Sequence, residues 1–496
     1  MWNHKEDQSN HKERIERNQN DSGSEEKSLK NFEDSDQTVS TSVLDSGKIT
    51  SNNDLNSKSP QCQCDEFDKS EFEDLKICLC SLRNFSLNLF DLQPSYSTPY
   101  LQSQPMFYDN PGQLFNYIRK CRRWIKVSRP NNTSRLEEFS LTTYNILSQN
   151  LLLNHLYLYQ NLNRSDLEWI ERSNRLKKEL IDLNSDIFCL QEVHMQNFTT
   201  SILPWLKKLG YQEVSKQKTG ENHDGCSILF KKTKFQLQDS LEIQMNRLDL
   251  SCLLDRDQIA LVVKLKPIGK LRTSDTNLII ANTHLLFNPK RGDIKLAQLR
   301  LLLAEIQRFA VWNRPNQIPC EDPFKMKYFP IILCGDFNSE PGSPLIKFLE
   351  NGEFNFDGLR SGDISGQFDG KHKGRFLCKN DILLNGIDSN SCYDEKSMKN
   401  TATESNDEKD LNLKHVLNLQ SVYPTVDEFN NPLVSIATMY DQGLVDHLFY
   451  SRNHQNLQLA AFHQLMSKRN LAKIGSLPNS ILGSDHISLS AKFYLS

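Results

Sequence analysis

The chain has 496 residues, of which 38% are hydrophobic and 24% charged, and its formal net charge is −3. On length alone it could hold two or three domains. No apolar run is long enough to cross a bilayer, and the weak charge disfavours an enzyme that grips duplex DNA through many phosphate contacts.

The charge is divided unevenly along the chain. Residues 1–100 carry 19 acidic and 11 basic residues, a net charge of −8, which leaves +5 on the remainder. Residues 1–95 are rich in Asn, Ser, Asp, Glu and Lys and have few apolar residues, so they cannot bury enough apolar area to offset the entropy of ordering. We predict a disordered acidic tail that could recruit protein partners. The mildly basic remainder suits a phosphate-bearing polymer.

The start of the chain predicts an intracellular protein. It lacks the apolar core of a secretory signal and carries acids early, against a mitochondrial signal as well. The twelve cysteines are scattered, and Cys189, Cys226 and Cys334 lie in apolar strand patterns, where a free thiol packs as a small hydrophobe. We expect a cytoplasmic location, a nuclear location or both.

A linker with a basic segment, residues 96–135, is expected to follow the tail. Its dense basic run is Arg119–Lys126, with Trp124 between the cations. Interleaved arginine and tryptophan could follow an RNA backbone and stack a base. A solvated helix ahead of the next domain explains the run equally well, and both interpretations stay open.

Alternating helices and strands are predicted for a catalytic domain over residues 136–496. Asp166 can cap a helix whose apolar face holds Leu167, Ile170, Leu176, Leu180 and Leu183. Later segments predict a helix ending at Gly210, strands over residues 226–230 and 258–263, a long helix over residues 292–312, and a short helix from Pro341 or Pro344 to Gly352. A polar stretch at about 363–414 is expected to be a mobile surface insertion.

Several short apolar strands end in, or begin beside, a polar functional group. They are residues 141–145, 187–192, 278–284, 330–339, 445–450 and 484–489. In the fourth, Asp336 and Asn338 are two residues apart and therefore face the same side of the chain. A lone pair of this kind is usually a turn. Six such segments together indicate a site at the ends of strands, where sheet proteins build them.

These segments carry a resemblance to a known family. In chain order they contain YNIL, LQEV, NTHL, GDFNS and SDH, and this set resembles the endonuclease/exonuclease/phosphatase superfamily. Residues 282–296 and 251–257 resemble its Angel family, in particular the homolog 2 branch, and the nocturnin and deadenylase group is related. The resemblance covers about residues 139–350 and 422–496. It implies a DNase I-like, four-layered α/β sandwich made of two packed mixed sheets flanked by helices.

Two departures from the family pattern stand beside the predicted site. His447 occupies a position where relatives usually carry an aromatic residue, and Ser488 one where many carry proline. Neither change removes a catalytic group, but His447 could alter the edge of the site.

The family chemistry is metal-assisted phosphoester hydrolysis, with Mg²⁺ as the expected ion and Mn²⁺ as an alternative. Mg²⁺ prefers oxygen ligands and keeps several waters, so one or two protein oxygens suffice. Glu192 is the expected ligand, and the resemblance implies that Asn145 lies next to it or on the phosphate. Asp485 would stand behind the metal or help bind a second one. Asp336 would activate the attacking water, which Asn338 holds.

The remaining predicted residues contact the phosphate and the substrate. His486 would donate to a phosphate oxygen while Asp446 orients its other ring nitrogen, and His284 would contact the phosphate from the opposite side. The loops around Asp224 and Arg256 are expected to decide which substrate fits. The predicted substrate contacts are Asn145, His284, Asn338, Asp224 and Arg256.

The resemblance implies a single-stranded RNA 3′ end as the substrate of a monomeric catalytic domain. The Angel resemblance implies hydrolysis of 2′,3′-cyclic phosphates, and the nocturnin and deadenylase group implies a 3′–5′ exoribonuclease acting on poly(A). Both activities use the same metal and base, so the sequence leaves them open. The alternative is a non-catalytic protein that binds mRNA 3′-untranslated regions and regulates translation on a nuclease scaffold.

Overall fold

The computed structural model describes residues 110–127, 137–269, 276–312, 322–367, 374–378, 382–394 and 412–495. The predicted acidic tail, 1–95, lies outside these residues, as do parts of the predicted linker 96–135 and of the predicted insertion 363–414. Those boundaries therefore stay predictions.

The first large sheet has seven strands in the order β1-β17-β19-β2-β3-β5-β4. Its strands are β1 Trp124–Lys126, β17 Leu457–His463, β19 Leu489–Leu495, β2 Glu137–Asn145, β3 Ile187–Gln191, β5 Gly225–Lys231 and β4 Tyr211–Gln217. Only β2 and β3 pair in parallel, and every other neighbouring pair is antiparallel.

The second large sheet has six strands in the order β12-β16-β9-β8-β7-β6. They are β12 Leu419–Ser421, β16 Asp446–Ser451, β9 Ile331–Asp336, β8 Leu278–His284, β7 Ile259–Pro267 and β6 Phe235–Gln244. Here β8 and β9 form the parallel pair. Three short pairs complete the strands: β10 Glu353–Asn355 with β11 Asn412–Lys414, β13 Leu433–Val434 with β18 Met466–Ser467, and β14 Ile436–Ala437 with β15 Gln442–Gly443.

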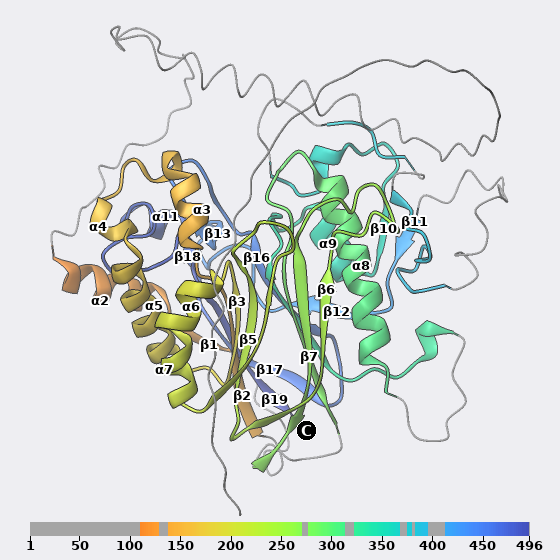
Figure 1. The fold of residues 1–496 in the computed structure, drawn as a ribbon, viewed down its shortest axis with the longest axis horizontal. Helices are drawn as coiled ribbons and strands as arrows, with labels where there is room; N and C mark the ends of the chain where they lie inside the picture. The colour runs from red at the N-terminus through yellow and green to blue at the C-terminus, as the bar shows by residue number, and fades with distance from the viewer. Residues whose placement is uncertain are drawn as a thin grey trace, which may run out of the picture. The chain divides into compact units, whose positions relative to one another are not determined.

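Helices cover the outer faces of both sheets (Figure 1). They are α2 Pro111–Cys121, α3 Gln149–Asn154, α4 Arg164–Leu167, α5 Trp169–Leu183, α6 Met195–Ser201, α7 Leu203–Lys208, α8 Gly292–Ala310, α9 Pro344–Asn351 and α11 Lys468–Leu471, with short 3₁₀ turns at Leu156–Tyr159, Pro323–Lys325 and Ser361–Asp363. No helix in the described ranges combines the length and apolarity of a membrane span.

Alternation along each strand divides the core into layers. On β8, Leu278 and Ile280 face the first sheet, whereas Ile279 and Ala281 face α8. Strand side chains alternate between faces, so one apolar strand can serve both layers. Tyr144 and the outward residues of β3 pack in the same way against α5, α6 and α7. The result is the four-layered α/β sandwich predicted from the sequence.

One detail differs from the sequence prediction, and two others refine it. The helix expected to begin at Asp166 is broken at Glu168, so Ile170 lies exposed on α5 instead of in its apolar face. The short helix begins at Pro344 because the Ser343 side chain caps it, and it ends at Gly352. Within the predicted insertion, the described residues Ile364, Ile382, Leu384 and Ile387 are buried against the α8 layer.

Candidate active site

Strand register brings the predicted polar residues to one edge of the sandwich. In the second sheet His284 and Asp336 end neighbouring parallel strands and are paired in register, and Asp446 starts β16 opposite Asp336. In the first sheet Asn145 ends β2 beside β3, which leads into Glu192. Parallel strands place their carboxyl ends at the same edge, so four strand ends meet there.

Asn145 connects the two sheets at this edge. Its Nδ2 donates to Glu192 Oε1 at 2.9 Å and to Asp336 Oδ2 at 3.1 Å. Its Oδ1 accepts from the Leu147 backbone N–H at 3.0 Å, which fixes which way the amide points. The other Glu192 oxygen accepts from the Ser148 backbone N–H at 3.0 Å. The Asn145 amide therefore fixes the positions of the Glu192 and Asp336 carboxylates relative to each other.

Two of the site residues have unusual backbone angles. Glu192 has φ of 51° and Asn338 has φ of 46°, both in the left-handed region. Asparagine tolerates this region, whereas for glutamate it costs free energy that the surrounding contacts must supply. Glu192 directly follows β3 and Asn338 lies two residues after the end of β9, so both left-handed turns occur where a strand gives way to the site. Strain at these positions is typical of functional sites.

His486 and Asp446 form a buried hydrogen-bonded pair. His486 Nδ1 lies 2.7 Å from Asp446 Oδ2, and Nε2 lies 3.8 Å from Asp336 Oδ2. Burial opposes the charged imidazole, but the carboxylates of Asp446, Asp485 and Asp336 raise the pKa of His486 well above its usual value. His486 is therefore held protonated, with one N–H on Asp446 and the other aimed at the site.

Asp336 lies at the centre of the cluster. Burial and the neighbouring Asp446 raise the pKa of Asp336 to about 7, although its Oδ1 accepts from the Asn338 backbone N–H at 2.9 Å. A carboxyl with a pKa near neutral can take a proton from water, which is the property of a general base. The surroundings of Asp336 are compatible with the role predicted for it, which stays a prediction.

His284 lies beside Asp336 with an available polar edge. Its Nε2 is 3.5 Å from Asp336 Oδ2, and its buried Nδ1 has no hydrogen-bond partner among the described residues. Burial, then the nearby Lys218 and His486, lower the pKa of His284 well below its usual value. A neutral, incompletely bonded imidazole at this edge is suited to contacting a ligand.

The family model described as "Endonuclease/Exonuclease/phosphatase family" matches residues 142–486. The chain belongs to the endonuclease/exonuclease/phosphatase family. It is 37% identical to protein angel homolog 2 of Mus musculus over 391 residues, and 36% identical to the Homo sapiens homolog 2 over 390 residues. Each match covers 72% of this chain and 69% of the relative, and shows Angel family membership.

A solved member of the endonuclease/exonuclease/phosphatase family has the same fold. The structure titled "Crystal structure of ANGEL2, a 2',3'-cyclic phosphatase, in complex with adenosine-2',3'-vanadate" superposes with a TM-score of 0.66 at 36% identity. The match covers 75% of this chain and 98% of that one. The resemblance and the fold class predicted from the sequence are both confirmed.

Members of this family depend on a metal, and the donor set fits one on the Glu192 side of the site. Burial and the carboxylates of Asp485 and Asp224 raise the pKa of the half-buried Glu192. A cation would offset this accumulation of like charges. A second group, Asp336, Asp446 and His486, has ligand atoms within 4.8 Å of one another. We favour Glu192, because a cation in the second group would have to displace the proton that the surrounding carboxylates hold on His486.

The structure brings all but one of the predicted site residues into this cluster. Asp224 pairs with Lys218, whose side chain is 9% exposed, at 2.7 Å, and Asp485 Oδ2 accepts from the Tyr159 hydroxyl at 2.8 Å. Arg256 instead pairs with its chain neighbour Asp255 at 2.6 Å. Among the interactions of the described residues, none joins Arg256 to the cluster, so its predicted substrate contact has no support from this geometry.

Three residues missed by sequence analysis support the site from behind. Arg172 on α5 is fully buried and donates to the backbone oxygens of Ile146, Leu147 and Gly483, which fixes the loops that carry Asn145 and Asp485. The buried Lys295 on α8 donates to the Asn338 backbone oxygen at 2.5 Å, and burial lowers the pKa of Lys295 to about 7. Lys218 holds Asp224, as above. Lys295 could have been found in the sequence, because it is a charged residue within the apolar pattern of the long helix.

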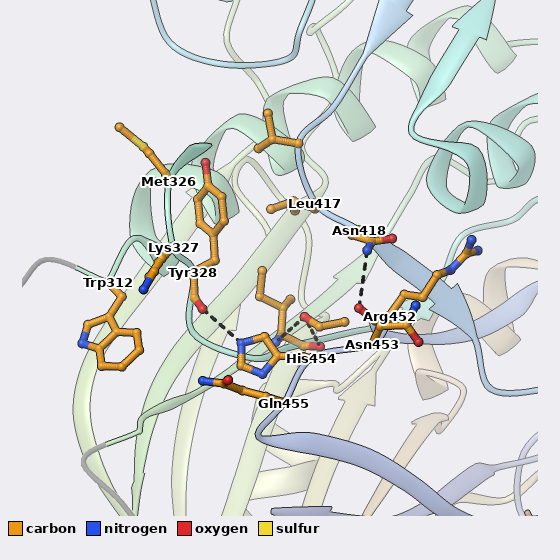
Figure 2. A pocket seen from close by; sticks show the side chains of 13 residues that line it. Trp312, Met326, Lys327, Tyr328, Leu417, Asn418, Arg452, Asn453, His454 and Gln455 are labelled. Carbon is orange, nitrogen blue, oxygen red and sulfur yellow. Dashed lines mark hydrogen bonds between the residues drawn. The ribbon is translucent and has the colours of Figure 1, made fainter. Parts of the chain in front are cut away.

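A cavity of about 430 Å³ lies at the other end of the same strands (Figure 2). It is lined by Ile331, the first residue of β9, and Ser451, the last residue of β16, whereas Asp336 and Asp446 lie at the opposite ends of these strands. Five residues of strand separate the two ends by roughly 16 Å. Among the described residues no acid lines this cavity, so it offers no carboxylate to hold a metal ion.

His447 is one of the two departures from the family pattern, and we expect it to make the stability of the fold depend on pH. Its ring packs against both Phe337 and Phe449, Nε2 lies 2.8 Å from the Ser339 carbonyl oxygen, and burial lowers the pKa of His447 to about 4. The unfolded chain binds a proton below about pH 6.5, whereas the folded chain does not until about pH 4. The free energy of unfolding therefore falls as the pH drops through this window, by on the order of 1–3 kcal/mol.

His447→Phe should remove this share of the acid sensitivity. Urea unfolding at pH 7 and pH 4.5 should show a smaller stability loss on acidification for His447→Phe than for the parent protein. His155→Phe, at an exposed histidine, serves as the control and should keep the parent pH dependence. An equal loss in the parent and His447→Phe would contradict this account.

Proposed function

We propose that the protein is a Mg²⁺-dependent phosphoesterase that hydrolyses terminal 2′,3′-cyclic phosphates on RNA. The observation that carries the proposal is the convergence of Glu192, Asp336 and His486 at one edge, in a chain 36% identical to a structure titled as a 2′,3′-cyclic phosphatase. The proposal includes a single-stranded RNA 3′ end as partner, and a cytoplasmic or nuclear location.

Glu192 would hold the metal, with Asp485 behind it. Asn145, predicted as a second ligand, turns its Nδ2 toward Glu192 while its Oδ1 accepts from the Leu147 backbone N–H, so it would orient the Glu192 carboxylate instead of ligating the metal. Bound Mg²⁺ would neutralise charge on the phosphate and so favour attack by water on an anionic centre. The two hydrogen bonds that Glu192 accepts, from Asn145 and from the Ser148 backbone, keep its carboxylate oriented before a metal arrives.

The protein residues would handle the protons of the reaction. Water attacks phosphorus while Asp336 takes its proton, and the bond from phosphorus to one ribose oxygen breaks, so that oxygen leaves with a proton from solvent. Asn338, whose Nδ2 is held by the Leu285 carbonyl oxygen at 3.1 Å, would position the water through its amide oxygen. His486 would donate its Nε2–H to a phosphate oxygen while Asp446 keeps the ring in place.

Two end-defined RNAs test the proposal. One ends in a 2′,3′-cyclic phosphate, and the other carries a poly(A) tail with a free 3′ hydroxyl. With Mg²⁺ the cyclic end should open to a monophosphate without loss of nucleotides, and the poly(A) RNA should keep its length. Gel mobility before and after treatment with a phosphomonoesterase separates these products. Chelation of the metal should stop the reaction.

The converse pattern would replace this proposal. Shortening of the poly(A) RNA with no change in the cyclic end would assign a deadenylase-like exonuclease to the same site. That result would leave the metal and base assignments intact, because both reactions need them.

A further inference from the structure

A groove separate from the active site lies between α2 and α5. It has a volume of about 820 Å³ and is lined by Phe115 and Arg119 of α2, Arg123, Trp124 of β1, Lys178 of α5, and Leu482. The two helices lie next to each other on the outer side of the first sheet (Figure 1), where Lys178 Nζ lies 4.9 Å from the centre of the Phe115 ring. The basic run singled out in the sequence therefore forms one wall of a concave surface.

Three cations of this groove are exposed and unpaired. Arg119, Arg123 and Lys178 have no carboxylate within salt-bridge distance in the described part of the chain. Arg122, by contrast, is buried, pairs with Glu179 at 3.2 Å, and donates to the Ser488 backbone oxygen. Within the run, Arg122 is therefore structural, Arg119 and Arg123 line the groove, and Lys120 and Lys126 are not among its lining residues. Unpaired exposed cations are a surface for anionic ligands.

The acidic residues of the groove do not cancel these charges. Glu171 lies 3.9 Å from Arg175, which also pairs with Asp166 at 2.8 Å. Asp182 is the other exposed acid in the lining. The groove keeps a net positive charge, which favours a polyanion over a basic or neutral segment.

Aromatic rings lie among the cations. Arg119 and Lys178 both stand over the half-buried Phe115 ring, at 5.7 and 4.9 Å. Trp124 is 37% exposed, and Lys492 Nζ lies 5.1 Å from the centre of its ring. Aromatic rings beside cations are the combination that holds single-stranded nucleic acids, because every base has a face to stack and every link carries a charge. An acidic peptide would use the cations but has no need of the rings.

One end of the groove lies close to the active site. Ser480, Ile481 and Leu482 line the groove, and Asp485 follows three residues later. Three residues of chain span at most about 11 Å. Arg172 of α5 holds the intervening Gly483 carbonyl oxygen at 2.8 Å, so the groove wall and the site loop are tied to the same helix. A strand whose end occupies the site could continue into the groove.

We propose that this groove binds the body of the single-stranded RNA whose 3′ end is processed in the active site. The inference rests on the proposed function for its substrate, and adds a second binding site that makes hydrolysis depend on RNA length. The contacts would be to phosphates and base faces, so they would carry little sequence preference.

Adjacent lysines on α5 provide a matched test. Lys178 lines the groove, whereas Lys177 does not. We would compare Lys178→Glu with Lys177→Glu on two substrates, adenosine 2′,3′-cyclic monophosphate and a 15-nucleotide RNA with a 2′,3′-cyclic phosphate end. At low salt Lys178→Glu should reduce kcat/KM for the long RNA by about tenfold and leave the mononucleotide unchanged. The slope of log kcat/KM against log salt should become shallower by about 0.7. Lys177→Glu should match the parent on both substrates.

The outcomes separate this inference from the proposed function. If the parent opens both substrates and Lys178→Glu equals Lys177→Glu on the long RNA, the groove does not bind RNA. If the parent hydrolyses neither substrate, the proposed function fails. Fluorescence anisotropy of the labelled 15-nucleotide RNA then tests RNA binding in the groove by itself. Tighter RNA binding by the parent and Lys177→Glu than by Lys178→Glu would support the groove as an RNA-binding site. Equal RNA binding by all three, with a poly-glutamate peptide bound less well by Lys178→Glu, would assign the groove to an acidic protein segment.

Discussion

Replacing Glu192 by alanine should abolish hydrolysis while the protein stays folded. The loss should reach roughly 10³-fold or more, because the variant lacks the expected metal ligand, and such a metal contributes several kcal/mol to the transition state. The variant should still fold, because the ionised Glu192 side chain is disfavoured where it lies. Burial and the carboxylates of Asp485 and Asp224 raise the pKa of Glu192. Its removal relieves repulsion among buried acids instead of creating an unpaired charge.

Metal binding supplies a readout that is independent of turnover. Millimolar Mg²⁺ should raise the Tm of the parent protein and should raise that of Glu192→Ala much less, because a ligand stabilises only the state that binds it. Glu221→Ala, at an exposed acid in the loop before β5, is the control and should behave as the parent does. Unchanged hydrolysis by Glu192→Ala at millimolar Mg²⁺ would sink the assignment.

The sequence predicted the strand ends because their signal is local. Each is a short apolar run with a polar residue at one end, and the strands β2, β3, β8, β9 and β16 form where this pattern occurs. The predicted segment 484–489 is the exception, because β19 begins only at Leu489. Parallel pairing then brings the ends together, so the cluster of Asn145, Glu192, Asp336 and His486 follows from the fold. The fold and family are confirmed, whereas the individual residue roles remain predictions.

The supporting contacts could not be predicted because they join distant parts of the chain. Arg172 reaches Gly483, 311 residues away, and Tyr159 reaches Asp485, 326 residues away. The residues next to Arg172 and Tyr159 in the sequence do not indicate which distant residue each of them contacts. The break in the helix at Glu168 was not predicted for another reason. The apolar spacing continues through Glu168, and Ile170 is exposed only because α4 and α5 pack as separate helices.

Replacing Asp336 by asparagine should separate binding from catalysis. The amide keeps the size of the carboxylate and can still accept from the Asn338 backbone N–H, but it cannot take a proton from water. Hydrolysis should fall by at least ~10²-fold, the scale of a lost general base, while RNA affinity stays close to that of the parent. The burial that raises the pKa of Asp336 to about 7 also means that a neutral amide is tolerated there without a charge penalty.

Paired measurements on the parent and Asp336→Asn decide between the two classes of function left open by the sequence. Fluorescence anisotropy gives RNA affinity, and single-turnover hydrolysis of the cyclic-phosphate RNA gives the chemical step. A scaffold that only binds RNA has no need for buried carboxylates and imidazoles, which are costly to keep, yet Asp336, Asp446 and His486 are all in place. If neither protein hydrolyses any RNA end with Mg²⁺ or Mn²⁺ and both bind RNA equally well, the enzyme hypothesis fails. A translation-regulating RNA-binding protein on a nuclease scaffold would then take its place.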